Sequence, residues 1–150
     1  MVEIVRFKAE HAISLLQGGV VESDMKVSEP NEVVKRIAQC YEAEGCSVTI
    51  LLGGKPLCSA LISILWNGVA QLAALISVET KNHKIEACRA MRKVIDILFR
   101  DLELHRIQTT VRVDFPIGQR FAEWAGFTKE GIAVQHSHDK IDAYYYGFVR

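Results

Sequence analysis

The stretch VAQLAALISV-ETKNH-KIEACRAMRKVIDILFRDL, residues 69–102, decides the fold. Its first ten residues, Val69–Val78, are almost continuously apolar, as in a strand that is covered on both faces. Polar residues then interrupt the run, and from Ile85 onward apolar residues recur three or four positions apart with charged residues between them. That spacing predicts an amphipathic helix with one core-facing side. The stretch therefore predicts a buried strand that leads directly into a helix.

The turn between this strand and this helix is the first candidate for a binding site. The first amide groups of a helix have no intrahelical acceptor, and the helix dipole places partial positive charge at the same end. A turn of this kind therefore favours an anionic ligand.

The composition is that of one globular domain, and we expect residues 1–150 to form it. The chain is 49% hydrophobic and 24% charged, which allows a real core but hardly two of them. Its 18 basic and 18 acidic side chains cancel, so no global field would attract nucleic acid or an anionic membrane. We therefore expect no sequence-specific binding of nucleic acid.

The N-terminus and the cysteines favour a cytoplasmic location. Charged residues such as Glu3 and Arg6 interrupt the apolar core that a signal peptide needs. The four cysteines show no C-x-x-C spacing and are predicted to be reduced, buried thiols. Residues 56–78 are long and apolar enough to resemble a membrane span, but Asn67-Gly68 near their centre is a strong hairpin signal and argues against one.

The remaining elements follow from short-range patterns of apolar, capping and turn residues. Residues 20–27 have no firm period and indicate a loop or a poor helix. The predicted helices are Ala9–Leu16, one that starts at Ser28 and ends near Gly45, the one from Ile85, and one from Pro116 to Gly126 with Ile117, Phe121, Trp124 and Ala125 facing inward. The predicted strands are Glu3–Phe7, Ser47–Leu52, Leu57–Trp66, Val69–Val78, Arg106–Val113, Ile132–Gln135 and Ala143–Val149.

Connections between these elements predict the sheet. The three strands between Ser47 and Val78 are joined by short turns and should form an antiparallel meander. The strand Arg106–Val113 follows Val69–Val78 through a helix, so these two strands should be parallel. The predicted fold class is α/β: a single domain with a mixed, mostly antiparallel sheet flanked by helices.

Several motifs near the C-terminus resemble a known family. They are HRI at 105–107, RFAEWAGF at 120–127, KEG at 129–131 and DAYYYG at 142–147. This pattern is similar to that of the GCN5-related N-acetyltransferase (GNAT) superfamily, in which a helix ends in Gly-Phe and the next strand begins with Glu-Gly. The resemblance implies that fold for essentially the whole chain, and acetyl-coenzyme A as the cofactor if the protein is active.

The cofactor loop departs from the superfamily pattern. In the superfamily, a Q/R-x-x-G-x-G/A loop wraps the pyrophosphate of acetyl-coenzyme A with its backbone amides. Aligned on Met91, Glu86 and Cys88 stand where the loop has its small residues. A carboxylate in the first turn stabilises a helix by roughly 0.3–1 kcal/mol, but it would repel a pyrophosphate. The resemblance therefore implies a degenerate loop, as in phage-borne GNAT-like virion proteins.

Two further departures fall in the same site. The asparagine and serine that follow the fifth strand in many members correspond to Phe115 and Gly118. The tyrosine that often protonates the departing thiolate corresponds to Ala122, although some active members also lack it. Three departures at one site favour a loss of cofactor binding.

If the site is active, the resemblance assigns roles to residues of the strand-to-helix turn and of the next strand. Backbone amides would polarise the acetyl carbonyl and hold pantetheine like an added strand, and two side chains would face the phosphates. The expected cofactor-binding residues are Leu75, Ile76, Ser77, Val78, His83 and Lys84. The expected catalytic base is Glu79 or His105. The alternatives are a solvated carboxylate for Glu79 and a linker residue for His105.

Two other clusters are interpreted as structural. His136 and His138 could place two imidazoles on one strand face, but no third ligand has a recognisable spacing, so we predict a polar hairpin tip and no metal site. The run Tyr144–Tyr146 could stack bases, but basic residues do not cluster beside it, and packing on a sheet explains it better.

Two functions from different classes remain open. The first is a descendant of an acetyltransferase that has lost its cofactor and serves as a structural or interaction protein, with protein partners in an assembly. By analogy with internal virion proteins involved in DNA ejection by short-tailed phages, it would be located within a phage virion or in the cytoplasm. The second is an active N-acetyltransferase that modifies a protein N-terminus or a small amine.

Overall fold

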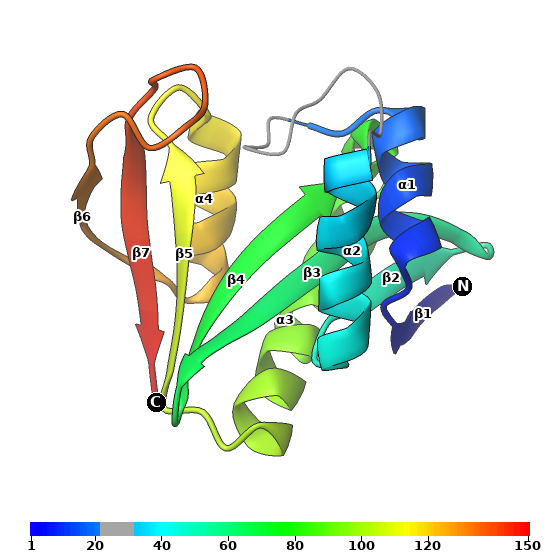
Figure 1. Cartoon of the computed structure of the whole chain (residues 1–150), viewed down its shortest axis with the longest axis horizontal. Helices are drawn as coiled ribbons and strands as arrows, with labels where there is room; N and C mark the ends of the chain where they lie inside the picture. The colour runs from blue at the N-terminus through cyan, green and yellow to red at the C-terminus, as the bar shows by residue number, and fades with distance from the viewer. Residues whose placement is uncertain (22–31) are drawn as a thin grey trace. The chain divides into compact units, whose positions relative to one another are not determined.

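The computed structural model describes residues 1–21 and 32–150 (Figure 1). Its strands are β1 (Val2–Arg6), β2 (Val48–Leu52), β3 (Lys55–Trp66), β4 (Val69–Ile76), β5 (Arg106–Arg112), β6 (Thr128–Ala133) and β7 (Ala143–Val149). Its helices are α1 (Ala9–Gly18), α2 (Glu32–Glu44), the short 3-10 helix η1 (Val78–Asn82), α3 (Lys84–Asp101) and α4 (Pro116–Ala125). The predicted helix start at Ser28 and most of the loop predicted over residues 20–27 lie outside the described residues.

The strands form one mixed sheet. Its order is β1-β2-β3-β4-β5-β7-β6. β4 and β5 are parallel, whereas β1–β2, β2–β3, β5–β7 and β6–β7 are antiparallel. The predicted fold class, α/β with a mixed and mostly antiparallel sheet, is confirmed, and so is the parallel pair joined by the long helix.

The chain groups into two compact units, and β3, β4 and α3 contribute to both. The first unit holds Met1–Ser63 and Ala74–Val94, and the second holds Ile64–Ala73 and Ile95–Arg150. Apolar strand and helix faces supply the core of the first unit, as the alternating and helical patterns require. Its most deeply buried large side chains are Phe7, Leu15, Ile50, Leu61, Ile62, Leu75 and Val94.

A chain of hydrogen bonds crosses the core of the first unit. Thr49 and Ser59 are completely buried, and their hydroxyl oxygens lie 2.8 Å apart. Thr49 Oγ1 also lies 3.0 Å from His11 Nδ1, which accepts a hydrogen bond from the backbone amide of Lys8 at 3.2 Å. Because His11 Nδ1 is an acceptor there, the structure suits the neutral imidazole. Burial lowers the pKa of His11, a shift that the charge of Glu10 partly opposes.

The lowered pKa of His11 makes stability depend on pH. The folded state holds the pKa of His11 below its unfolded value of about 6.5. The stabilisation is therefore complete above that value and is lost as the pH falls through the folded pKa. We expect the urea midpoint to decrease between pH 7 and pH 5. The decrease should be smaller in His11→Asn, which keeps an acceptor but does not titrate; an equal decrease in both proteins would contradict this account.

Aromatic side chains form the core of the second unit. The ring of Phe148, on β7, lies between Phe99 at 5.1 Å and Phe127 at 5.5 Å, measured between ring centroids. On the same face of β7, Tyr146 is fully buried and its hydroxyl donates to Glu123 of α4 at 3.3 Å. The tyrosine run therefore includes a core residue packed on a sheet, as predicted.

In the C-terminal third, the predicted bounds of one strand are wrong and the predicted inward face of α4 is partly wrong. The strand after α4 spans Thr128–Ala133 and not Ile132–Gln135, because Gln135 has a φ of 50°, which ends an extended segment. On α4, Ala125 is buried as predicted and Phe121 is half-buried, but the second buried residue is Ala122, and Ile117 and Trp124 are 65% and 45% exposed.

The prediction for the cysteines is partly wrong. All four are free thiols, as predicted, but only Cys58 is buried, and Cys40 is exposed on α2. None of the helices described is long and apolar enough to cross a membrane. The Asn67-Gly68 hairpin signal is confirmed: both residues lie in the tight turn that joins β3 to β4, where Gly68 has a φ of 79°.

Candidate functional site

The first unit contains the end of β4 and the turn that follows it. β4 ends at Ile76, and Ser77 then caps η1, with its hydroxyl oxygen accepting a hydrogen bond from the amide of Glu79 at 3.2 Å. The hydroxyl of Thr80 donates to the carbonyl of Leu57 at 3.3 Å and holds η1 against β3. The strand-to-helix turn predicted from the sequence is thus a short, internally bonded 3-10 helix.

The backbone of this strand end presents its groups alternately to two sides. The amide of Ser77 donates to the carbonyl of Leu57 on β3, at 2.9 Å. By alternation, the backbone groups of Leu75 also face β3, whereas those of Ile76 and Val78 face the opposite side. An added strand of any kind, including pantetheine, would need the groups of Ile76 and Val78.

A segment of the same chain already uses those groups. The amide of Val21 donates to the carbonyl of Ile76 at 2.8 Å, and the amide of Val78 donates to the carbonyl of Gly19 at 3.1 Å. Val20 accordingly forms an antiparallel bridge with Ser77. The segment Gly19–Val21 therefore pairs with the end of β4 through one isolated bridge, on the side that faces away from β3. The carbonyl of Ile76 and the amide of Val78 are thus bound by this segment, and the amide of Ser77 is bound by β3.

The N-terminus of α3 is the place where the phosphates of the cofactor would be expected to bind. The amide of His83 donates to Thr80, and its carbonyl accepts the amide of Ala87 at 3.0 Å. The amides of residues 84–86 precede the first intrahelical donor, so they have no acceptor within the helix. Lys84 and Glu86 are exposed and His83 is half-buried. The positive helix end thus carries its own carboxylate, Glu86, in its first turn.

The two candidate bases lie beside different ends of β4. Glu79 is exposed in η1, after the carboxyl end of the strand, and its carboxylate accepts a hydrogen bond from Asn82 at 3.3 Å. His105 belongs to the second unit, where its amide donates to Gly68, immediately before β4 begins, at 2.8 Å. Its ring covers Gly68 so closely that a Cβ there would lie 2.3 Å from His105 Nδ1. The cofactor-binding candidates are together in the first unit, and His105 is not among them.

The positions expected to bind the cofactor through α4 are filled by an aromatic ring. A Cβ on Gly118 would lie 2.4 Å from Cδ1 of Phe115, so Phe115 packs directly on the glycine of the first turn of α4. Ala122 is 6% exposed, and its carbonyl accepts the amide of Phe127 at 3.0 Å. Phe115 and Gly118 therefore stand where many superfamily members have asparagine and serine. Ala122, at the position of the superfamily's tyrosine, is buried within the unit.

A row of polar side chains on β5 was missed as a candidate for function. β4 and β5 pair only from Val69–Arg106 to Gln71–Gln108, although β5 continues to Arg112. At the last pair, the side-chain amide of Gln108 donates to that of Gln71 at 3.1 Å. The alternation of β5 places Arg106, Gln108, Thr110 and Arg112 on one face, and this polar alternation was the available signal.

The arginine at the end of β5 is bound by two carboxylates. Arg112, 9% exposed, donates to Asp114 and to Asp139 through two hydrogen bonds each, all of 2.9 Å. These bonds raise the pKa of Arg112 and lower those of Asp114 and Asp139. Because both carboxylates are bound, the cluster joins β5 to the loop before β7 and offers no free acid or base.

Two further groups, Tyr146 and His136, each lie within hydrogen-bond distance of a neighbouring side chain. Burial and the neighbouring Glu123 raise the pKa of Tyr146 to about 12, so its hydroxyl stays protonated at neutral pH. His136 Nε2 lies 3.3 Å from the hydroxyl of Thr110. Within residues 1–21 and 32–150, no group of three His, Cys, Asp or Glu side chains could hold a metal ion.

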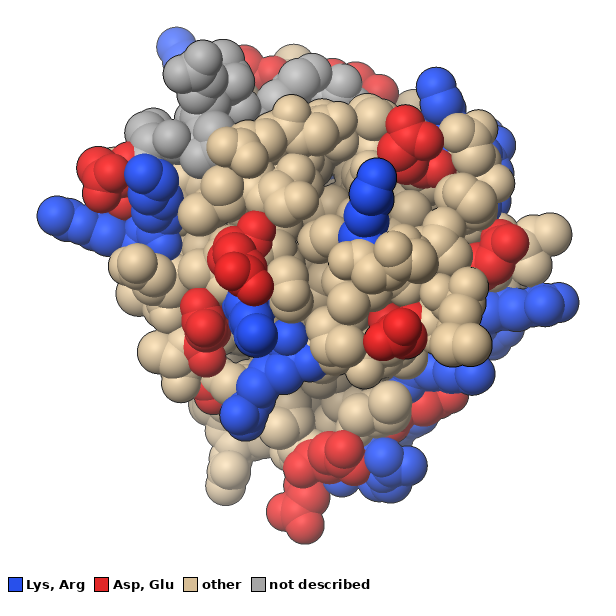
Figure 2. All heavy atoms as spheres, turned by 90° about the vertical axis from the view of Figure 1, so that its right-hand side faces the viewer, with Lys and Arg blue, Asp and Glu red and all other residues tan. Residues whose placement is uncertain are grey.

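Surface charge does not form a patch of one sign on the face drawn in Figure 2. There, Lys and Arg side chains alternate with Asp and Glu side chains over its described part. A surface of this kind has no long-range preference for a polyanion.

Comparison with known proteins identifies the fold. No protein-family model matches the chain, and no curated protein matches it significantly. Ard1 from Thermoplasma volcanium superposes with a TM-score of 0.78 at 13% identity, over 99% of this chain and 97% of that chain. A GNAT-family acetyltransferase from Streptococcus pneumoniae gives 0.76 at 16% identity, over 100% of both chains. A variant of the spermidine N-acetyltransferase SpeG from Vibrio cholerae gives 0.71 at 16% identity, over 99% and 93%.

These similarities extend over essentially the whole chain, and at such low identities they establish the fold alone. The single α/β domain predicted from the element order, with its mixed sheet and its parallel β4–β5 pair, has the fold of the GNAT acetyltransferases.

Proposed function

We propose that this protein is a non-catalytic member of the GNAT fold class, in which the chain itself occupies the cofactor edge of β4. The observation that carries the proposal is the pair of backbone hydrogen bonds between Gly19–Val21 and the end of β4. Pantetheine would have to displace this segment before it could bind as an added strand. The residues present therefore do not fit acetyl-coenzyme A.

The energetic cost of that displacement is substantial. Each backbone hydrogen bond contributes about 0.5–1.5 kcal/mol, and a buried group left without its partner costs more. Breaking two of them without replacement would weaken a ligand by roughly one to two orders of magnitude in dissociation constant. Hydrogen bonds from the cofactor to β4 would offset part of this cost. The cofactor would, however, have to compete with a segment that is covalently attached and therefore present at high effective concentration.

Two independent features support the same conclusion. Glu86 places a negative charge in the first turn of α3, where a pyrophosphate would have to lie. In the second unit, Phe115 packs on Gly118 in the first turn of α4. Each feature replaces a polar or small group by one that repels or excludes the cofactor.

The proposed role is that of a structural or interaction protein in an assembly. A fold kept without its cofactor site is retained for its surface, so protein partners are the expected ligands. By analogy with the internal, ejection-related virion proteins of short-tailed phages, we place such a protein within a virion or in the cytoplasm of its host. Copurification of the native protein in a stoichiometric complex would support this role.

An active N-acetyltransferase is the second candidate. The open amides at the start of α3, with Lys84 and His83 beside them, favour it, and one of the similar structures is a spermidine N-acetyltransferase. The acceptor would then be a small amine or a protein N-terminus. Glu79 and His105 would be the first residues to mutate.

Isothermal titration of the purified protein with acetyl-coenzyme A, in low-phosphate buffer, separates the two functions. We expect no heat of binding up to millimolar ligand, because β4 is occupied and Glu86 repels the phosphates. A circular dichroism spectrum of the same sample checks that the protein is folded. Binding in the micromolar range would reject the non-catalytic function and justify a screen of amine substrates.

A further inference from the structure

Helix α2 carries an apolar stripe that its own unit leaves exposed. The helix buries Val34 and Ala38 against the first unit. Next to this buried side of the helix, three apolar residues are exposed: Val33 (63%), Ile37 (40%) and Cys40. Their spacing of four and three residues places them on one side of the helix, as in a helix that packs against another helix.

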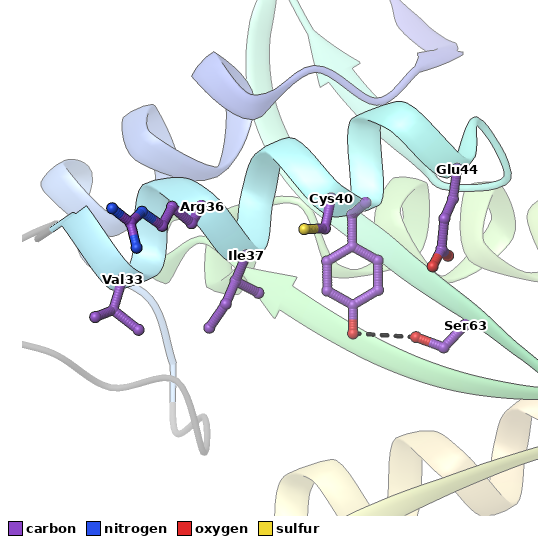
Figure 3. Close-up of a pocket in the computed structure, with 7 residues that line it drawn as sticks. Val33, Arg36, Ile37, Cys40, Glu44 and Ser63 are labelled. Carbon is purple, nitrogen blue, oxygen red and sulfur yellow. Dashed lines mark hydrogen bonds between the residues drawn. The ribbon is translucent and has the colours of Figure 1, made fainter.

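A groove runs along this stripe. It has a volume of about 370 Å³, and its seven lining residues include Arg36, Tyr41 and Glu44 of α2 and Ser63 of β3 (Figure 3). The hydroxyl of Ser63 donates to that of Tyr41 at 3.3 Å and fixes the floor of the groove. Figure 3 shows the Val33 and Ile37 side chains projecting from α2 toward the same side. Six of the seven lining residues belong to α2, so the groove follows this helix and fits an elongated partner better than a compact one.

The charges of the groove are arranged symmetrically about Cys40. Arg36 lies four residues before Cys40 and Glu44 lies four residues after it, and both side chains are exposed. Four residues correspond to about 6 Å along a helix. If two copies of α2 are antiparallel and related by a two-fold axis at Cys40, Arg36 of each copy lies opposite Glu44 of the other. The same two-fold axis generates this ion pair twice.

We propose that the groove along α2 is the docking site for α2 of a second copy of this chain. In this antiparallel pair, Ile37 of one copy lies about two residues, or 3 Å along the axis, from Tyr41 of the other. Ile37 therefore enters the groove of the partner copy, and the Arg36–Glu44 pairs border the apolar contact on both sides. A uniformly charged peptide or nucleic acid would match only one of the two charges, whereas a second copy matches both.

The size of the contact sets its strength. A helix of 13 residues is about 20 Å long, so a single helix pair buries less than the roughly 1,600 Å² of a standard interface. The expected dimer is therefore weak and dependent on protein concentration. The proposal uses neither β4 nor Glu86, so it stands or fails independently of the acetyl-coenzyme A question.

Charge reversal tests the pairing directly, with sedimentation equilibrium over a range of protein concentrations as the measurement. We expect the wild-type protein to dimerise reversibly. Arg36→Glu and Glu44→Arg should each weaken dimerisation at least about tenfold, because each creates two like-charge contacts around the axis. The double variant Arg36→Glu/Glu44→Arg should restore it to within a few fold of the wild type. Glu3→Arg, the same charge change at an exposed residue of β1, is the matched control and should leave dimerisation unchanged.

Cross-linking adds a second readout that does not depend on charge. Cys40 of the two copies should face each other across the axis, so a short bis-maleimide should trap a dimer that Cys40→Ser abolishes. A wild-type protein that stays monomeric at the highest concentration would overturn the proposal. A dimer that the single reversals leave intact, or that the double variant fails to restore, would also overturn it. Arg36 and Glu44 are exposed, so the charge reversals should leave the stability of the fold unchanged, and thermal melts of the variants verify this.

Discussion

Replacing Gly126 with alanine is expected to lower the free energy of unfolding by about 3 kcal/mol. Gly126 ends α4 with a φ of 111°, a conformation that costs energy for any residue with a Cβ. A Cβ there would also lie 2.4 Å from Cε2 of Phe148. The ring of Phe148 cannot move aside because Phe99 and Phe127 hold it on both sides. Urea unfolding followed by tryptophan fluorescence measures the loss.

Gly131 provides the matched control for this variant. It lies on β6 in the same unit, and a Cβ there would meet no atom within 4 Å. Gly131→Ala should therefore change the free energy of unfolding by less than about 0.5 kcal/mol. Equal effects of the two substitutions would show that Gly126 is not constrained by the aromatic core.

Replacing Glu86 and Cys88 with glycine should not by itself restore cofactor binding. We expect Glu86→Gly/Cys88→Gly to leave acetyl-coenzyme A binding undetectable, because Gly19–Val21 still occupies β4. Adding Val21→Pro deletes the amide that donates to Ile76. In isothermal titration, the triple variant should therefore show binding that the double variant lacks, which corresponds to a gain in affinity of at least about tenfold.

A proline one residue earlier is the control for this experiment. Gly19 and Val21 direct their bonded groups toward β4, so by alternation the amide of Val20 points away from it. Val20→Pro in the same background should give no gain. If the double variant alone binds acetyl-coenzyme A, the charge of Glu86 was the barrier, and the occupied strand edge was not.

The elements and most of the sheet could be predicted because their patterns are local. The apolar run of β4, the helical spacing of α3 and the Asn67-Gly68 turn each depend on a few neighbouring residues. The errors arose where local patterns are ambiguous. The Gly131 that follows a register shift in β6 looks like a strand breaker, and only the φ of Gln135 shows where the strand has ended. On α4, large apolar side chains were among those predicted to face inward, but the buried residues are Ala122 and Ala125.

The strand-to-helix turn could be located from the sequence, but the hydrogen-bond partners of its backbone could not. The absence of glycine at Glu86 and Cys88 is visible in the residues themselves. The bridge between Val20 and Ser77 is not, because it joins segments 57 positions apart (77 minus 20) and involves backbone groups, which every residue has. Likewise, the sequence shows Phe115 and Gly118 at positions where many GNAT members have asparagine and serine, but it does not show that the ring of Phe115 lies on Gly118.

Amide hydrogen exchange of Val21 and Val78, measured by NMR with and without acetyl-coenzyme A, tests the central claim most directly. If Gly19–Val21 occupies the edge of β4, both amides are protected, because each donates to a backbone carbonyl. Millimolar acetyl-coenzyme A then changes neither their exchange rates nor the amide shifts of residues 76–84. Rapid exchange of Val21, together with shifts of those residues on adding acetyl-coenzyme A, would show that the edge is open and that the cofactor binds there.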